Sequence, residues 1–399
     1  MAGDRPGLRR RYPAVRAGTS VVEGLDPSGR PVALTLAQGL IQSVREAPDA
    51  GGGRRILPGF IDIQVNGFGG YDLNREGVTV EDVAGVVRTL WRCGVTRFCP
   101  TICTESRERM MAALATIARA CDELPWVARA VVSVHVEGPY ISPEDGPRGA
   151  HPRRHVRPPA WDEVEAFQEA AGGRIRMLTL APELPGAIEI IERLGGAGII
   201  PAIGHTAADR AELLAAVRAG AQISTHLGNG SHAMIPRHHN YIWEQLALDE
   251  LWASLIVDGH HLPPAVVKVF VRAKGPQRCV LTSDAVWLAG LPPGVYQLHD
   301  HAVELTPERK VRLVGTPYLA GSAIDLASAV GNAVAFAGVS FEQAVRMASA
   351  QPAALLGRPD IGALQPGMPA DLVVASWDAD AARLEVLQTI IAGKIVHGG

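Results

Sequence analysis

Three residues that commonly bind metal ions, Glu137, His205 and His226, each stand at the end of a short apolar run. One carboxylate and two imidazoles make up the open three-ligand set of a catalytic zinc-type site, in which the remaining coordination position is left for water. Asp284 ends a later apolar run in the same way. A carboxylate beside a metal-bound water can take its proton and later deliver it to a leaving amine. These four residues predict metal-dependent hydrolysis, with Asp284 as the catalytic acid–base group.

Each of these residues also has an ordinary structural interpretation. A single histidine at the end of a strand is more often a core or surface residue with satisfied hydrogen bonds, and a single aspartate is often a helix cap. That interpretation would require several unrelated buried polar residues, each with its own hydrogen-bond partners. We therefore interpret the three ligands and the acid as one site.

Eight short apolar runs alternate with longer segments of helical pattern, which is typical of βα units and a parallel sheet. The expected strands are Phe60–Asn66, Thr96–Thr101, Ala130–Glu137, Ile175–Ala181, Gly198–His205, Ala221–His226, Ala253–Asp258 and Cys279–Asp284. Eight such runs predict an α/β fold, a closed (β/α)₈ TIM barrel. Barrels of this class build their active sites at the carboxyl ends of the strands, which is where the four residues above stand.

Helical patterns fill the segments between these strands and continue beyond the eighth strand. The expected helices include Val80–Cys93, Ser106–Cys121, Trp161–Ala171, Ala207–Ala219, Ala323–Ala337 and Phe341–Leu356. In the fourth of these, Asp209 and Glu212 suit the first turn, because acidic side chains are favoured near the N-terminal end of a helix. Residues 295–315 predict an extra hairpin after strand eight.

The two ends of the chain differ from its middle. Ser20–Val44 and Asp371–Val396 are rich in Val, Leu and Ile, contain Gly and Pro turns, and lack a sustained helical period. We expect residues 1–55 and 359–399 to form one small β-sandwich domain, which a catalytic barrel of residues 56–358 interrupts. The 399 residues allow this division, since a barrel of this class takes about 250.

The composition excludes several classes of protein. A chain with 47% hydrophobic residues, 20% charged residues and a net charge of −3 is neither disordered nor basic enough to predict nucleic-acid binding. Its N-terminal stretch lacks the apolar segment of a signal peptide, and no apolar run approaches the roughly 18 to 20 residues that span a membrane. Five scattered cysteines without a C-x-x-C pair predict reduced thiols in a cytoplasmic protein.

The order of several short motifs also resembles a known family. The motifs are Pro58-Gly59-Phe60-Ile61-Asp62, His135-Val136-Glu137-Gly138-Pro139-Tyr140, Gly149-Ala150-His151, Ala181-Pro182-Glu183, Gly204-His205-Thr206, Thr225-His226-Leu227, Val257-Asp258-Gly259-His260-His261, Ser283-Asp284-Ala285 and Leu319-Ala320-Gly321-Ser322. In this order they resemble the N-acetylglucosamine-6-phosphate deacetylases of the amidohydrolase superfamily, over residues 56 to 399. The resemblance implies that an N-acetylated amino sugar is the small-molecule substrate and that acetate is released.

Strand one departs from most amidohydrolases. These enzymes carry His-x-His there, which binds a second metal, whereas this chain has Gln64 and Asn66. Neutral amides are poor ligands beside imidazole. We therefore expect one divalent metal per chain, with Gln64 and Asn66 lining the site and hydrogen-bonding to water or substrate. The ligand set suits zinc, and it also accepts iron(II), cobalt or manganese.

The resemblance further implies a set of substrate contacts. His151 matches a histidine near the acetamide, and His261 matches one that reaches the sugar phosphate, with His260 as its adjacent rival. Arg237, eleven residues after His226, matches an arginine that enters the partner subunit's site, which implies a homodimer. Guanidinium suits phosphate because its planar fork donates two parallel hydrogen bonds. The remaining implied contacts are Asn229, Gly230 and Leu319.

Two alternatives remain beside an N-acetylglucosamine 6-phosphate deacetylase. The first is another amidohydrolase activity, on a different N-acetylhexosamine, an N-acyl-D-amino acid or a cyclic amide. The segment Leu227-Gly228-Asn229-Gly230-Ser231 lacks the aromatic residue and the Ala-Met of the family, which leaves the phosphate contact open. The second is a binding protein that kept the barrel without catalysis. Retention of all three ligands and of Asp284 argues against it.

Overall fold

A parallel sheet of eight strands forms the centre of the computed structural model, which describes residues 18–50, 53–298, 301–315 and 319–398. The strands follow one another in chain order, and a bridge between Val65 and Ala285 joins the first strand to the residues after the last. The sheet is therefore a nearly closed barrel, and the predicted fold class is confirmed. Its strands are β5 (Phe60–Val65), β8 (Val95–Cys103), β9 (Val134–Glu137), β10 (Ile175–Leu180), β11 (Ile200–Ile203), β12 (Ile223–Ser224), β13 (Trp252–Leu255) and β14 (Cys279–Leu281).

Several of these strands are shorter than the sequence predicts. The third begins at Val134 because Pro125–Ala130 forms a short helix, α3, with proline in its first turn, where its missing N–H is not needed. His205, His226 and Asp284 follow their strands by two or three residues instead of ending them. Each of the three has a positive φ, of 51°, 31° and 47° respectively, which L-amino acids seldom adopt.

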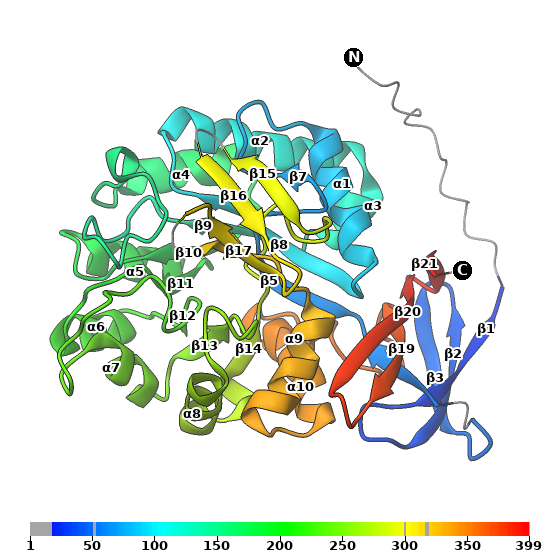
Figure 1. Ribbon diagram of the computed structural model, residues 1–399. Helices are drawn as coiled ribbons and strands as arrows, with labels where there is room; N and C mark the ends of the chain where they lie inside the picture. The colour runs from blue at the N-terminus through cyan, green and yellow to red at the C-terminus, as the bar shows by residue number, and fades with distance from the viewer. Residues whose placement is uncertain (1–17, 51–52, 299–300, 316–318, 399) are drawn as a thin grey trace.

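Helices surround the barrel (Figure 1). Their bounds are α1 (Val80–Trp91), α2 (Arg107–Glu123), α4 (Trp161–Ala170), α5 (Ala187–Gly196), α6 (Arg210–Arg218), α7 (Tyr241–Ala247), α8 (Pro264–Lys274), α9 (Leu326–Asn332), α10 (Phe341–Met347) and α11 (Ala350–Leu355). Asp209 caps α6 and forms a capping box with Glu212, as suits these two residues. A π-helix, Ala333–Ala337, extends α9.

The predicted helix Phe341–Leu356 is two helices. Pro352 has no N–H to give to the Ala348 carbonyl, so one continuous helix would lose a bond there. In the structure the Ala348 carbonyl instead accepts a hydrogen bond from Ile61 N–H of β5 at 2.9 Å. The break therefore ties the helical layer to the first barrel strand.

Strands from both ends of the chain share a separate sheet of seven strands, which Figure 1 shows in blue and red beside the barrel. It has its own buried core, which includes Leu34, Ile41 and Leu372. The expected small β-domain from the two chain ends is thus observed, while its exact boundaries at residues 55 and 359 stay predictions. The strands are β1 (Ser20–Leu25), β2 (Pro31–Ala37), β3 (Leu40–Glu46), β4 (Arg54–Pro58), β19 (Leu372–Asp378), β20 (Arg383–Ile391) and β21 (Lys394–His397).

An insertion after β14 is larger than the predicted hairpin. It is an antiparallel sheet of four strands, β15 (Gly294–Leu298), β16 (His301–Leu305), β17 (Lys310–Leu313) and β18 (Leu319–Ser322). A parallel bridge between Ser322 and Ala285 brings β18 beside the residue that follows Asp284. The insertion therefore borders the carboxyl-terminal rim of the barrel. A second small pairing joins β6 (Gly67–Phe68) to β7 (Tyr71–Asp72). None of the described helices is long and apolar enough to cross a membrane.

Candidate active site and metal centre

Glu137, His205 and His226 converge at the rim of the barrel. Glu137 Oε1 lies 2.9 Å from His226 Nε2 and 3.3 Å from His205 Nε2, and the two nitrogens are 3.1 Å apart. All three side chains are buried. Their ligand atoms lie within 4.8 Å of one another, the only such group of three found among the described residues. The structure thus brings together the three predicted metal ligands.

The hydrogen bonds of His205 leave one ring nitrogen available to a cation. Its Nδ1 lies 2.8 Å from the Pro147 carbonyl, which can only accept. Nδ1 therefore carries the proton, and in the neutral ring Nε2 presents a lone pair toward Glu137 and His226. A carboxylate oxygen and imidazole lone pairs in one buried place repel one another unless a cation lies between them. The residues present therefore fit a divalent metal ion.

The pKa values of Glu137 and His226 are shifted in directions that agree with a cation site. Burial opposes ionisation of Glu137, but its contacts with the His205 and His226 rings outweigh the effect of burial and hold the Glu137 pKa well below its ordinary value. Burial likewise opposes protonation of His226, yet the hydrogen bond and charge of Glu137 raise its pKa. Both directions mean that a positive charge at this point is stabilised.

Asp284 lies beside the metal-ligand cluster, three residues beyond β14. Burial, followed by the charge of Glu137, raises its pKa to about 7. Asn66 Nδ2 donates a hydrogen bond to Asp284 Oδ1 at 2.7 Å. A carboxyl group with a pKa near 7 is half ionised at neutral pH, so it can take up and return a proton there. This is the property that a general acid–base group needs.

The two amides of strand one lie against the acidic residues. Gln64 Nε2 donates to Glu137 Oε1 at 2.8 Å, and Asn66 bridges Asp284 and the Cys103 thiol, which lies 3.0 Å from Asn66 Oδ1. Sequence reasoning missed Cys103 because the predicted strand ended at Thr101 and the cysteines were considered only for disulfides. Cys103 is the last residue of β8, and a polar residue at the carboxyl end of a barrel strand could have indicated a place in the site.

His151 also lies within the cluster. Its ring centre is 4.4 Å from that of His205, and its Nδ1 lies 2.8 Å from Thr104 Oγ1. Burial, followed by the charge of His205, lowers the His151 pKa to about 3. The ring is therefore neutral at physiological pH, and it can serve as a hydrogen-bond partner for a neutral amide.

The structure separates His261 from its neighbour His260. His261 Nδ1 lies 2.6 Å from Asp258 Oδ2, and its charge partly opposes the rise in the Asp284 pKa that burial and the charge of Glu137 cause. His260 Nε2 lies 3.0 Å from the Glu308 carbonyl of the insertion. The two rings therefore have different partners, since Asp258 holds His261 and the insertion holds His260. Asp258, which also accepts from the His261 backbone N–H, is the orienting residue that sequence reasoning did not assign.

Of the remaining predicted contacts, two lie against the metal ligands. Asn229 bonds back to the His226 carbonyl, and Gly230 packs against the His205 ring. Leu319 begins β18 and is half-buried. Arg237 is exposed, and no hydrogen bond or ion pair of its side chain with the buried cluster is found in the described part of the chain. Within one chain, the structure does not bring Arg237 into the site.

Comparisons with known proteins agree with this architecture. The amidohydrolase family model matches residues 55–396. The N-acetylglucosamine-6-phosphate deacetylase of Bos taurus is 38% identical over 86% of this chain and 84% of its own length. The N-acetylgalactosamine-6-phosphate deacetylase of Shewanella sp. is 34% identical, over 86% of this chain and 83% of its own length.

Solved structures show the same likeness. A mutant N-acetyl-D-glucosamine-6-phosphate deacetylase from Mycobacterium smegmatis, in complex with N-acetyl-D-glucosamine-6-phosphate, superposes with a TM-score of 0.82 at 30% identity, over 92% of this chain and 95% of that one. The enzyme of Thermotoga maritima also gives 0.82 at 30% identity, over 95% and 99%. The chain therefore belongs to the amidohydrolase family and, within it, to the N-acetylglucosamine-6-phosphate deacetylases. It is accordingly a hydrolase of a metal-dependent family.

Proposed function

We propose that this protein hydrolyses the acetamide of N-acetylglucosamine 6-phosphate to give glucosamine 6-phosphate and acetate. The observation that carries this proposal is the buried Glu137–His205–His226 cluster beside Asp284. It occurs in a chain that matches relatives named for this activity over 86% of its length.

We assign metal binding and proton transfer to different residues of the site. Glu137, His205 and His226 would hold one divalent ion, for which zinc is our assignment and iron(II), cobalt and manganese are alternatives. Such an ion supplies Lewis acidity to the acetamide carbonyl and to the attacking water. Asp284 takes the proton of that water and passes it to the leaving nitrogen.

Other side chains would orient the catalytic groups and the substrate. Asn66 fixes the carboxylate of Asp284, and Gln64 donates to Glu137, so neither amide is needed as a ligand for a second ion. The neutral His151 ring would hydrogen-bond the acetamide, and His261 would approach the phosphate. The substrate contacts proposed for the surrounding loops are Asn229, Gly230 and Leu319.

We further propose a homodimer in which Arg237 reaches the phosphate in the partner's site. Its exposure on one isolated chain supports this arrangement, because a side chain that works across an interface faces solvent when the partner is removed. All five cysteines are free thiols, which supports a cytoplasmic location.

A second candidate is the 6-phosphate of N-acetylgalactosamine, since a relative named for that substrate is 34% identical to this chain. The two sugars differ at a single ring hydroxyl, which the cluster that cleaves the acetamide does not need to contact. Any discrimination between the two sugars would therefore come from the surrounding loops.

A substrate panel tests the proposal. Acetate release would be measured with N-acetylglucosamine, its 6-phosphate, N-acetylgalactosamine 6-phosphate and an N-acetyl-D-amino acid, each with and without a chelator. We expect the highest kcat/KM with N-acetylglucosamine 6-phosphate and loss of activity with the chelator. Preference for an N-acetyl-D-amino acid would overturn the proposal, and activity that survives complete metal removal would overturn the metal mechanism.

A further inference from the structure

Two loops enclose His205 from opposite sides. The loop after β9 supplies the Pro147 carbonyl, which accepts a hydrogen bond from His205 Nδ1 at 2.8 Å. The loop after β12 supplies Gly230, at which a Cβ would lie 2.7 Å from His205 Nδ1 and 3.1 Å from the Pro147 carbonyl oxygen. The orientation of His205 therefore depends on how the two loops are held together.

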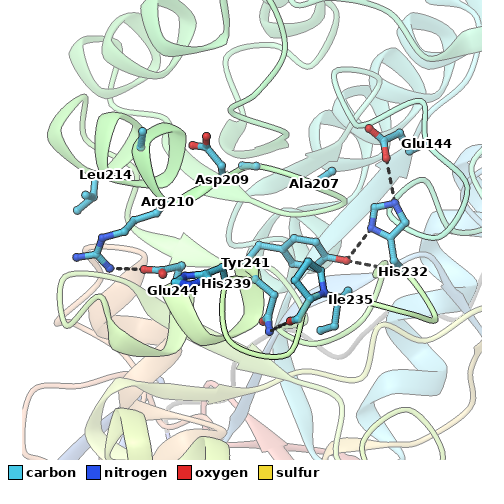
Figure 2. Close-up of a pocket in the computed structure, with 14 residues that line it drawn as sticks. Glu144, Ala207, Asp209, Arg210, Leu214, His232, Ile235, His239, Tyr241 and Glu244 are labelled. Carbon is cyan, nitrogen blue, oxygen red and sulfur yellow. Dashed lines mark hydrogen bonds and ion pairs between the residues drawn. The ribbon is translucent and has the colours of Figure 1, made fainter.

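Three side chains, Glu144, His232 and Tyr241, join these loops; we call them the latch. The His232 backbone N–H donates to Tyr241 Oη at 2.8 Å, and His232 Nδ1 lies 3.1 Å from the same hydroxyl. On the other side of the ring, His232 Nε2 lies 3.0 Å from Glu144 Oε2 (Figure 2). Tyr241 is the buried first residue of α7, so the latch anchors both loops to the helical layer.

The backbones of the two loops are in direct contact beside the latch. Gly146 has a φ of 103°, and a Cβ there would lie 2.8 Å from His232 Cα and 3.1 Å from the Ser231 carbonyl oxygen. Only glycine combines this conformation with so close an approach. Because Pro147 is the next residue, any movement of His232 is transmitted directly to the carbonyl that orients His205.

The latch faces an open groove of about 630 Å³, which lies outside the buried cluster. Figure 2 shows Glu144 and His232 at one end of this groove and the Arg210–Glu244 ion pair at the other. The Glu144 side chain is 60% exposed, and that of His232 is 29% exposed. Glu144 and His232 can therefore be altered without entering the buried core.

We propose that Glu144, His232 and Tyr241 are positioning residues that act through Pro147 on His205 and thereby slow the release of the bound metal ion. This inference rests on the metal centre of the proposed function. Partners that fix the tautomer and orientation of a ligating histidine typically contribute 10- to 100-fold to metal affinity. The latch acts one step further out, so we expect the lower end of that range, about tenfold.

Zinc release provides the test. The full chain is loaded with zinc, and transfer of the ion to a chelating dye is followed over time. Tyr241→Phe removes only the hydroxyl, and Glu144→Ala removes the exposed acceptor; we expect each to release zinc about tenfold faster than wild type. Glu144→Gln keeps an oxygen that accepts from His232 Nε2–H, so it should restore slow release. Glu244→Ala, which breaks the ion pair at the far end of the same groove, is the matched control and should behave as wild type.

The outcomes separate this inference from the proposed function. Release rates of Tyr241→Phe and Glu144→Ala within twofold of wild type would overturn the latch. So would equally fast release from Glu144→Gln or Glu244→Ala, because specific hydrogen bonding would then not be the cause. A wild-type chain that takes up none of zinc, iron(II), cobalt and manganese would overturn the metal centre and the latch together. Zinc uptake and slow release without any acetate release would overturn only the deacetylase proposal.

Discussion

The side chains of the buried cluster at the barrel rim and those of the outer loop, residues 233–239, differ in their exposure to solvent. In the cluster, Glu137 and His226 are each 3% exposed and lie 2.9 Å apart. In the outer loop, Met234 is 90% exposed and Arg237 is exposed. Bond cleavage needs atoms at fixed separations, whereas the outer loop would contact a phosphate or a second subunit only in the dimer that we propose.

Backbone conformation shows the same contrast. Seven non-glycine residues in the described part of the chain have positive φ, and three of them are His205, His226 and Asp284. Such conformations cost about 1–3 kcal/mol each and persist where the surrounding structure enforces them. None of residues 233–239, all of which are described, has a positive φ. The barrel thus enforces strained backbone at the chemical groups, while the outer loop carries no such strain.

Removal of a metal ligand should have the largest effect. In His226→Ala the cluster loses one of two imidazoles, so we expect zinc content to fall toward zero and kcat/KM to fall by about 10³-fold or more, since the metal supplies several kcal/mol of transition-state stabilisation. Elemental analysis and acetate release check both. His238→Ala, an exposed histidine of the outer loop, should keep its zinc. Equal zinc loss in His226→Ala and His238→Ala would contradict the assignment of the metal site to the buried cluster alone.

Removal of the acid–base group should have the next largest effect. Asp284→Asn keeps the shape of the side chain and the contact with Asn66 but cannot accept a proton. We expect kcat to fall by about 10² to 10⁴, with about one zinc per chain retained. Activity within a few-fold of wild type would show that Asp284 is structural. A stoichiometry near two metal ions in wild type would contradict the prediction of a single metal site.

The pH dependence of stability should distinguish the two regions without any substrate. Burial, followed by the charge of Glu137, raises the Asp284 pKa from 3.8 to about 7. A carboxyl whose pKa is raised by folding contributes full stability below its unfolded pKa, and that stability is lost as pH rises through the folded pKa. Metal-free Asp284→Asn should therefore unfold several degrees above metal-free wild type at pH 8, and the gap should close toward pH 4.

Calorimetry of the metal-free proteins at several pH values checks this expectation. Any difference in unfolding temperature between Arg237→Ala and wild type should stay constant with pH, because this substitution removes no carboxyl group. A gap between Asp284→Asn and wild type that widens toward low pH would have the wrong sign for a carboxyl with a raised pKa. It would mean that the ionised Asp284 stabilises the metal-free fold.

The difference between the regions also explains what the sequence could predict. Strand-forming runs placed Glu137, His205, His226 and Asp284 on one rim, because parallel strands in a barrel end at the same face. The positive φ of His205, His226 and Asp284 was not predictable. The sequence indicates where an apolar run ends, but not which conformation the backbone adopts after it. Asp258 and Cys103 were missed because their roles depend on contacts across the rim.

Predictions failed most where long-range contacts decide the local structure. The break between α10 and α11 depends on the hydrogen bond from Ile61 to the Ala348 carbonyl, nearly 300 residues apart in the chain. The sheet of four strands after β14 includes β18, which pairs with β17 and bridges to Ala285, and a predicted hairpin did not contain it. Hydrophobic and turn patterns within a short segment do not indicate which distant segment it pairs with.

Among the substitutions that affect catalysis, Arg237→Ala should have the smallest effect on kcat/KM. It tests whether the outer loop takes part in substrate binding. If the Arg237 guanidinium binds a phosphate, Arg237→Ala should weaken transition-state binding of a phosphorylated substrate by about 1.5–3 kcal/mol, the range for a hydrogen bond to a charged group. An unphosphorylated N-acetyl sugar should be nearly unaffected. Arg237→Lys should recover only part of the loss, since an ammonium ion cannot donate two parallel hydrogen bonds. Equal losses in kcat/KM on both substrates would refute the phosphate contact.

Mixing the Asp284→Asn and Arg237→Ala variants tests whether Arg237 acts across the dimer. A hybrid of an Asp284→Asn subunit and an Arg237→Ala subunit contains one site with both Asp284 and the partner's Arg237 intact, but only if the arginine is contributed in trans. Random exchange of subunits makes about half of the dimers hybrid, so about a quarter of wild-type activity should return. If Arg237 served its own chain, neither site of the hybrid would be complete, and activity would not rise above that of the Arg237→Ala sites. A chain that is monomeric by light scattering would exclude the exchange itself, and the outer loop would then be an ordinary solvent-exposed surface.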